Sequence, residues 1–186
     1  AAYEADPAWW EWDLVWLCWY AGDFDCSWDF FRRARRSDEQ GTGYTRWGSR
    51  PGPLIIAADS GRRLGHATEA QALHDRVEDM LASVARAAAP HTPDNLYEQA
   101  LLAAYEGRQD DAAALLIAGI ATGPRWRAAM AAPLFAEIRG RSDFRAAMQE
   151  QEAIRERQRR EVLDILCGKE PLPESLRPHP ATCAGR

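Results

Sequence analysis

The segment YAGDFDCSWDFFRRA, residues 20–34, places a glycine between two stretches that are rich in apolar residues. The segments RRLGHATEAQALHDRV (62–77) and AYEGRQDDAAALLIAG (104–119) share this layout, with their glycines at positions 65 and 107. Gly22, Gly65 and Gly107 are therefore 43 and 42 residues apart. Because glycine commonly follows the last turn of a helix, the spacing predicts three helix pairs that turn at these glycines.

Small residues recur at fixed distances from the three glycines. The positions four before each glycine are Cys18, Gly61 and Ala103, and the positions five after it are Ser27, Ala70 and Ala112. Small side chains at these positions let two helices cross closely. The positions nine after each glycine are Phe31, His74 and Leu116. We expect these larger side chains to fill the space toward the next pair.

The sequence predicts an all-α protein with helix pairs over residues 8–36, 54–88 and 96–122. Residues 125–167 are expected to close the domain with a short helix and a long capping helix. The inner stripe of the capping helix is formed by Phe144, Met148, Ile154, Val162 and Ile165. We expect one domain over residues 1–167 and a Pro-rich, poorly ordered tail over residues 168–186.

The turn glycine followed five residues later by a small residue resembles the tetratricopeptide repeat, over roughly residues 8–140. The runs PLFAEIR (133–139) and SDF (142–144) are similar to the end of such arrays in bacterial signalling and regulatory proteins. The resemblance implies a right-handed superhelix of antiparallel helix pairs. It also implies a non-catalytic scaffold that binds a peptide or protein segment in a concave groove.

In the family that the chain resembles, residues three, six, ten and thirteen before the turn glycine point into the groove. Counting back from Gly22 gives Trp19, Trp16, Trp12 and Trp9, which also share one helix face by their spacing. The counts from Gly65 and Gly107 add Ile55, Asp59, Arg62, Tyr97 and Leu101. We expect these nine residues to contact a partner, with the four tryptophans as anchors. Internal packing of the tryptophans remains open as an alternative.

The sequence offers no convergent nucleophile, acid and base, so we expect neither enzyme activity nor a cofactor. Two other functions remain open. The tryptophan face could be buried in a homodimer, or the groove could bind a small molecule as a sensor or an enzyme accessory domain.

Charge and hydropathy exclude two classes of partner. The net charge of −5 argues against nucleic acid and against an anionic membrane surface. A membrane span needs about 18 uninterrupted apolar residues. The aromatic segment WWEWDLVWLCWY (9–20) is interrupted by Glu11 and Asp13, so we expect no membrane span there.

Cysteine and histidine give weak signals. Cys18, Cys26, Cys167 and Cys183 are widely spread and lack a metal-ligand spacing, so we expect free thiols in the reducing cytoplasm. His66 and His74 are eight residues apart and could bind a metal only with a third ligand. We expect His74 to serve packing and the chain to hold no metal.

Overall fold

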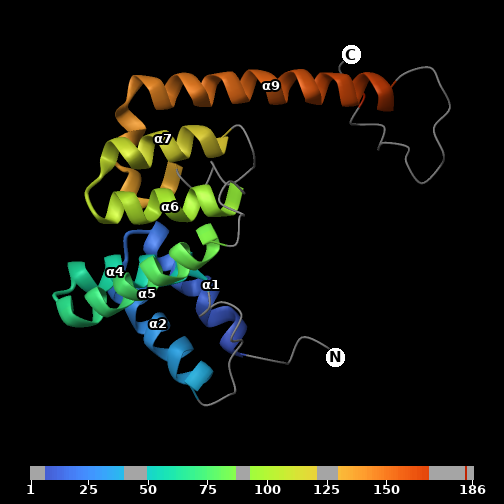
Figure 1. Cartoon of the computed structure of the whole chain (residues 1–186). Helices are drawn as coiled ribbons and strands as arrows, with labels where there is room; N and C mark the ends of the chain where they lie inside the picture. Colours follow the sequence, from blue (N-terminus) through green and yellow to red (C-terminus); the bar gives the residue numbers. More distant parts are fainter. Residues whose placement is uncertain (1–6, 40–49, 87–92, 121–129, 168–182, 184–186) are drawn as a thin grey trace, which may run out of the picture. The chain divides into compact units, whose positions relative to one another are not determined.

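The computed structural model describes residues 7–39, 50–86, 93–120, 130–167 and 183 (Figure 1). Within these ranges all regular secondary structure is helical and no strand occurs, which confirms the predicted all-α class. None of the helices in these ranges has both the length and the apolar character that crossing a membrane requires.

Three helix pairs follow one another along the chain. They are α1 (Pro7–Tyr20) with α2 (Phe24–Glu39), α4 (Pro51–Arg63) with α5 (Ala67–Arg86), and α6 (Pro93–Tyr105) with α7 (Gln109–Ile120). These bounds lie within a few residues of the predicted pairs. Of the short helix expected before the last one, Met130 and Ala131 are described and are helical, and the 3-10 turns η1 (Pro133–Phe135) and η2 (Ile138–Gly140) follow them. The long helix α9 (Ser142–Leu166) follows.

The same backbone turn closes the first helix of each pair. Gly22, Gly65 and Gly107 have φ values of 76°, 86° and 80°, in the left-handed region where a side chain is strained. The residue after each glycine donates its N–H to a carbonyl five residues earlier: Asp23 to Cys18, His66 to Gly61 and Arg108 to Ala103. This is the Schellman arrangement. The prediction that these glycines end helices is confirmed.

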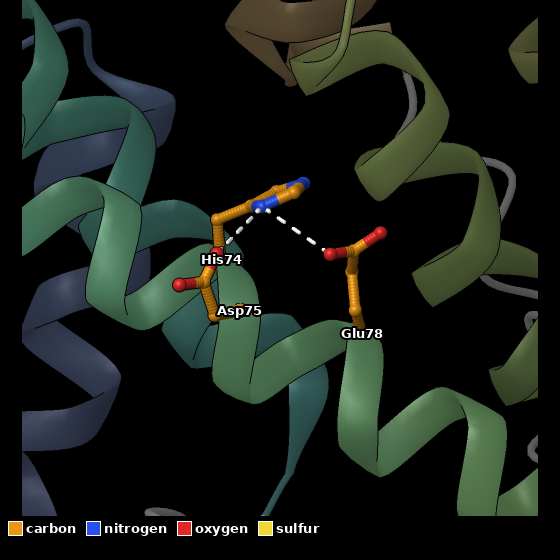
Figure 2. A group of neighbouring side chains, drawn as sticks. All are labelled: His74, Asp75 and Glu78. Carbon is orange, nitrogen blue, oxygen red and sulfur yellow. Dashed lines mark ion pairs between the residues drawn. The ribbon is translucent and has the colours of Figure 1, made fainter.

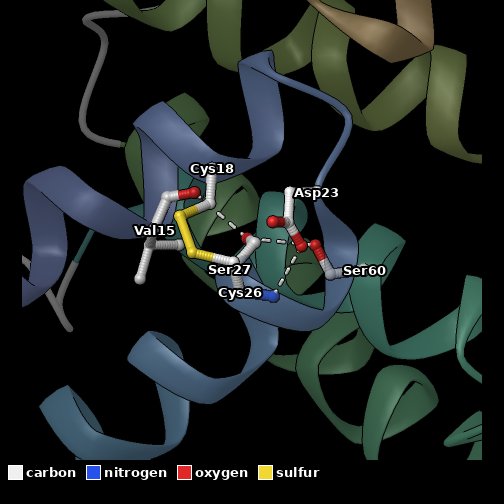
Figure 3. Close-up of a disulfide and its surroundings, with 6 residues drawn as sticks. All are labelled: Val15, Cys18, Asp23, Cys26, Ser27 and Ser60. Carbon is white, nitrogen blue, oxygen red and sulfur yellow. Dashed lines mark hydrogen bonds between the residues drawn. A yellow bond between two sulfur atoms is a disulfide. The ribbon is translucent and has the colours of Figure 1, made fainter.

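The hairpin of α1 and α2 is held together by side chains around this turn (Figure 3). Asp23 accepts a hydrogen bond from the backbone N–H of Cys26 at 3.0 Å and so caps α2. The buried Ser27 hydroxyl donates to the carbonyl of Val15 at 3.0 Å and accepts from Ser60 of α4 at 3.1 Å. Three helices therefore meet at one small hydroxyl.

A disulfide joins Cys18 of α1 to Cys26 of α2, and a second joins Cys167 to Cys183. None of the four cysteines is free, so the prediction of four free thiols is wrong. The position of the turn at Gly22 explains why Cys18 and Cys26 can form a disulfide. Cys18 and Cys26 are each four residues from Gly22, and an antiparallel helix hairpin brings positions equidistant from its turn face to face.

Helix α4 is the central element of the N-terminal part of the chain. It packs against α1, α2, α5 and α6. All of its residues from Pro51 to Gly61 are buried. Small residues make this possible: a Cβ at Gly61 would lie 3.0 Å from the ring of Trp28, and one at Gly52 would lie 3.1 Å from the ring of Trp16. Aromatic rings thus pack directly on the backbone of α4.

The chain forms two compact units, Ala1–Phe144 and Arg145–Arg186. The division falls inside α9, whereas the sequence placed the end of the first domain at residue 167. In the stripe predicted for α9, Phe144 is 1% exposed, while Val162 and Ile165 are 51% and 67% exposed. The tail predicted over residues 168–186 lies outside the described residues except for Cys183.

Candidate functional site on helix α1

Helix α1 buries a stripe that differs from the predicted one. Trp12, Val15 and Trp19 are 1%, 0% and 0% exposed, and Trp12 meets Phe31 of α2 edge-on with ring centroids 6.0 Å apart. Positions 12, 15 and 19 follow the helical period, so they lie on one side of α1. Trp12 and Trp19 are therefore core residues, which corrects their expected position on an open groove. The side chain of Trp9 lies outside the described residues.

Trp19 is fixed by a buried carboxylate. Its indole Nε1–H donates to Asp59 Oδ2 at 2.9 Å, and Asp59 is 0% exposed. Arg63 Nε lies 3.0 Å from both carboxylate oxygens, and Arg62 contributes a longer contact of 3.5 Å. The structure thus brings together three of the predicted site residues, Trp19, Asp59 and Arg62. Because the carboxylate is buried and already paired, it is a structural link between α1 and α4.

Arg62 extends this link to α6. Its guanidinium carbon lies 3.9 Å from the centre of the Tyr105 ring, and Nη1 donates to the carbonyl oxygen of Tyr105 at 2.7 Å. A cation over an aromatic face is attracted by the ring quadrupole. The exposed Arg62 is therefore held in one orientation by its contacts with α6.

Three further predicted site residues lie in the core. Ile55, Tyr97 and Leu101 are 1%, 4% and 0% exposed. Tyr97 is hydrogen-bonded through its hydroxyl to Tyr20 of α1, 3.1 Å away, and meets Phe135 edge-on. The expected exposure of these three residues is corrected in the same way as that of Trp12 and Trp19.

The accessible part of the aromatic segment is a hollow on the other side of α1. It has a volume of about 270 Å³ and is lined by Asp13, Leu14, Trp16, Leu17 and Tyr20. Leu17 is 62% exposed, and the other four side chains are partly exposed. Trp16 is thus the one tryptophan of the predicted set that is described at an accessible surface.

The walls of the hollow are held in place from behind. Trp16 packs on the backbone of α4 at Gly52, and its ring lies 5.8 Å from that of Tyr20. Tyr20 is in turn hydrogen-bonded to Tyr97 of α6. Two aromatic walls are therefore fixed by the core, while Leu17 and Asp13 project from α1 alone. A surface of this kind needs little side-chain ordering when it binds a partner.

Sequence reasoning missed Leu17, Asp13 and Tyr20 for an identifiable reason. The groove positions came from counting back along α1 from Gly22, which selects positions 9, 12, 16 and 19. The hollow uses the neighbouring stripe at 13, 16, 17 and 20, which has an equally regular helical spacing. The signal was present, but a helix with aromatic residues on several sides does not show which side faces the core.

Comparison with protein-family models, with curated proteins and with solved structures finds no match to this chain.

Proposed function

We propose that the chain is a non-catalytic interaction module that binds a protein segment in the hollow of α1. The segment would insert one large apolar side chain between Trp16, Leu17 and Tyr20. A neighbouring lysine or arginine of the partner would pair with Asp13. The observation that carries this proposal is an apolar hollow with fixed aromatic walls, an exposed leucine and, among its described lining residues, a single acidic one.

The hollow has room for one large side chain of a peptide. Its volume of about 270 Å³ lies near the lower end of the range of about 300–1,000 Å³ that is typical of small-molecule sites. A shallow surface of this volume suits one anchor residue of a longer segment.

Charge supports the choice of a basic partner. Among the described residues that line the hollow, Asp13 is the only charged one, and the chain as a whole carries a net charge of −5. A long-range field of this sign accelerates encounter with a cationic segment and disfavours an acidic one.

The compartment in which the module works follows from the cysteines. The cytoplasmic location predicted from the sequence depended on free thiols, but all four cysteines form disulfides. Because disulfides persist mainly in oxidising environments, we propose an oxidising compartment instead.

A tetratricopeptide-like superhelix and a regulatory role in a larger bacterial protein remain part of the proposal. The shared turn at Gly22, Gly65 and Gly107 supports a repeated arrangement of helix pairs, whereas the regulatory role in a bacterial protein rests on the sequence resemblance alone. Such a role requires no cofactor.

The test is a binding titration with a panel of short fluorescent peptides. Each peptide carries one Leu, Ile, Phe or Trp, flanked by lysines in one half of the panel and by glutamates in the other. We expect lysine-flanked peptides to bind more tightly, as measured by fluorescence anisotropy. Replacing Leu17 by serine should weaken binding about 10- to 100-fold, because a large apolar side chain contributes about 1.5–3 kcal/mol when it is buried. Asp13→Lys should abolish the preference for lysine flanks.

The matched control is Val162→Ser, which changes an exposed apolar residue of α9 and should leave peptide binding unchanged. Equal binding by wild-type protein and the Leu17→Ser variant would contradict the proposal. The molar mass should be measured over a dilution series in parallel. A dimer that dissociates in the Leu17→Ser variant, without any peptide binding, would instead support the homo-oligomer alternative.

A further inference from the structure

His74 breaks the pattern of the three helix pairs. The positions that are equivalent to it, nine residues after the turn glycine, are Phe31 and Leu116, which are 2% and 3% exposed. His74 places a polar ring at this position, with 13% of its side chain exposed. A residue that departs from a local packing rule is a candidate for a function.

The imidazole of His74 is held in a fixed orientation from α6 and the turn that follows it. Nε2 lies 2.9 Å from Glu106 Oε1, and the ring stacks on Tyr105 with centroids 5.6 Å apart. Arg108 Nε donates to the other carboxylate oxygen of Glu106 at 2.8 Å. Burial alone would raise the pKa of Glu106, but the hydrogen bonds from His74 and Arg108 hold it below its usual value. The Glu106 carboxylate is therefore fixed behind the ring by its contacts with His74 and Arg108.

The other nitrogen of the ring faces two carboxylates of α5. Figure 2 shows the ion-pair contacts that join His74 Nδ1 to the carboxylates of Asp75 and Glu78. The distances are 3.5 Å to Asp75 Oδ1 and 3.7 Å to Glu78 Oε2. The three ligand atoms all lie within 4.8 Å of one another. His74 and Glu78 are four residues apart and so lie on the same helix face.

We propose that His74, Asp75 and Glu78 form a binding site for a divalent transition-metal ion, with Zn²⁺ as the best match. In a tetrahedral site with Zn–ligand bonds of about 2.0–2.2 Å, neighbouring ligand atoms are about 3.4 Å apart. The two measured distances from Nδ1 are close to this value, so small rotations of exposed carboxylates suffice. Zinc also accepts a mixture of imidazole and carboxylate ligands. The fourth position would be taken by water or by a side chain of a partner.

Glu106 has the position of the outer carboxylate found in many metal sites. A histidine that binds a metal usually donates its second ring N–H to a carboxylate, which fixes the tautomer and strengthens the ligand. Gln71 Nε2 lies 3.3 Å from Nδ1 and donates to Asp75 at 2.7 Å. Donation by Gln71 to Nδ1 fits a ring whose proton is on Nε2, and a bound metal would take the place of Gln71 at the Nδ1 lone pair.

His66, the second histidine considered in the sequence, does not take part. It stacks on Trp28, with ring centroids 5.2 Å apart, and its Nδ1 lies 3.6 Å from Glu69. The sequence offered no third ligand for the pair His66 and His74. In the structure, two carboxylates of the same helix, Asp75 and Glu78, lie beside His74 in place of His66.

A proton competes with the metal ion for Nδ1 of His74. Although burial opposes it, the hydrogen bonds with Glu106 and Asp75 raise the pKa of His74 above its usual 6.5. The charged groups that face the ring are Asp75 and Glu78 on α5, and Glu106 with Arg108 beyond it. Metal binding therefore has to be measured at a pH well above 6.5, where Nδ1 is free to bind.

The experiment is a calorimetric titration of the full chain, disulfides intact, with Zn²⁺ alone. We expect one equivalent to bind. Glu78→Gln removes a ligand that is 56% exposed, so the fold should survive while affinity falls more than about tenfold. His74→Gln should remove the site, and Glu106→Gln should weaken binding about 10- to 100-fold by releasing the ring.

The matched control is Asp79→Asn, which removes an exposed acid from the same helix next to Glu78. Its affinity should equal that of the wild type. Loss of binding in Glu78→Gln and its retention in Asp79→Asn support the site, even if His74→Gln fails to fold. A wild-type chain that does not bind Zn²⁺, or a Glu78→Gln variant that binds as well as Asp79→Asn, overturns the proposal.

Discussion

Replacing Trp19 by alanine is expected to lower the free energy of unfolding by about 3–5 kcal/mol, the usual cost of truncating a large buried aromatic residue. Trp19 is 0% exposed and packs against Trp16 and Tyr20, with ring centroids 6.5 Å and 5.2 Å apart. The truncation also removes a donor from the buried carboxylate of Asp59. The measurement is urea unfolding followed by far-ultraviolet circular dichroism, because that signal does not depend on the tryptophan that is removed.

The control for this prediction is Trp19→Phe. It keeps most of the apolar ring but lacks the N–H that donates to Asp59. Its cost should be smaller, about 1.5–3 kcal/mol, the range for a hydrogen bond to a charged group. A Trp19→Ala variant as stable as the wild type would show that α1 does not pack on α4 as described, and the hollow behind Leu17 would lose its fixed walls.

The second large effect concerns the disulfide between α1 and α2. Replacing both Cys18 and Cys26 by alanine is expected to lower the free energy of unfolding by about 2.5 kcal/mol. The value follows from the loss of loop-closure entropy for a sequence separation of 8 residues. Unfolding followed by tryptophan fluorescence measures it well, because all eight tryptophans precede Phe144.

The matched control is the double replacement of Cys167 and Cys183, whose disulfide lies in the other compact unit. This variant should leave the tryptophan transition unchanged. If neither pair affects stability, and both cysteine pairs react with a thiol reagent in the native protein, the disulfides do not form and the proposed oxidising compartment fails with them.

The sequence was sufficient to predict the helices of this chain, because it contains clear helix-ending residues. Gly22, Gly65 and Gly107 each require a left-handed backbone, and each one marks a helix end that propensity alone would leave open. The small residues Ser27, Ala70 and Ala112 are all buried, as the spacing predicted. These features depend on residues close together in the chain.

The rotation of α1 could not be predicted in the same way. Aromatic residues at positions 10, 12, 16, 19 and 20 leave no polar side to identify the solvent. Tertiary contacts decide the outcome: the buried Asp59 of α4 accepts from Trp19, and the absence of a side chain at Gly52 makes room for Trp16. Both partners are more than thirty residues away in the sequence.

The candidate metal site could be predicted only in part. Asp75 and Glu78 were visible beside His74 in the sequence, but acidic residues are common on exposed helices. What distinguishes this group is Glu106, which comes from another helix pair and fixes the ring at 2.9 Å. A contact between residues 74 and 106 has no signature in either local segment.

The complete burial of α4 has a consequence for how this sequence can change over time. On α2 or α5, exposed positions alternate with buried ones, so mutations can accumulate on one side of the helix. From Pro51 to Gly61 there is no such side. Enlarging a residue displaces a neighbouring ring or helix, and introducing a charge leaves it buried without water. Descendants of this protein should therefore keep an uninterrupted block of small and apolar residues from Pro51 to Gly61, while the sequences of the surrounding helices change more freely.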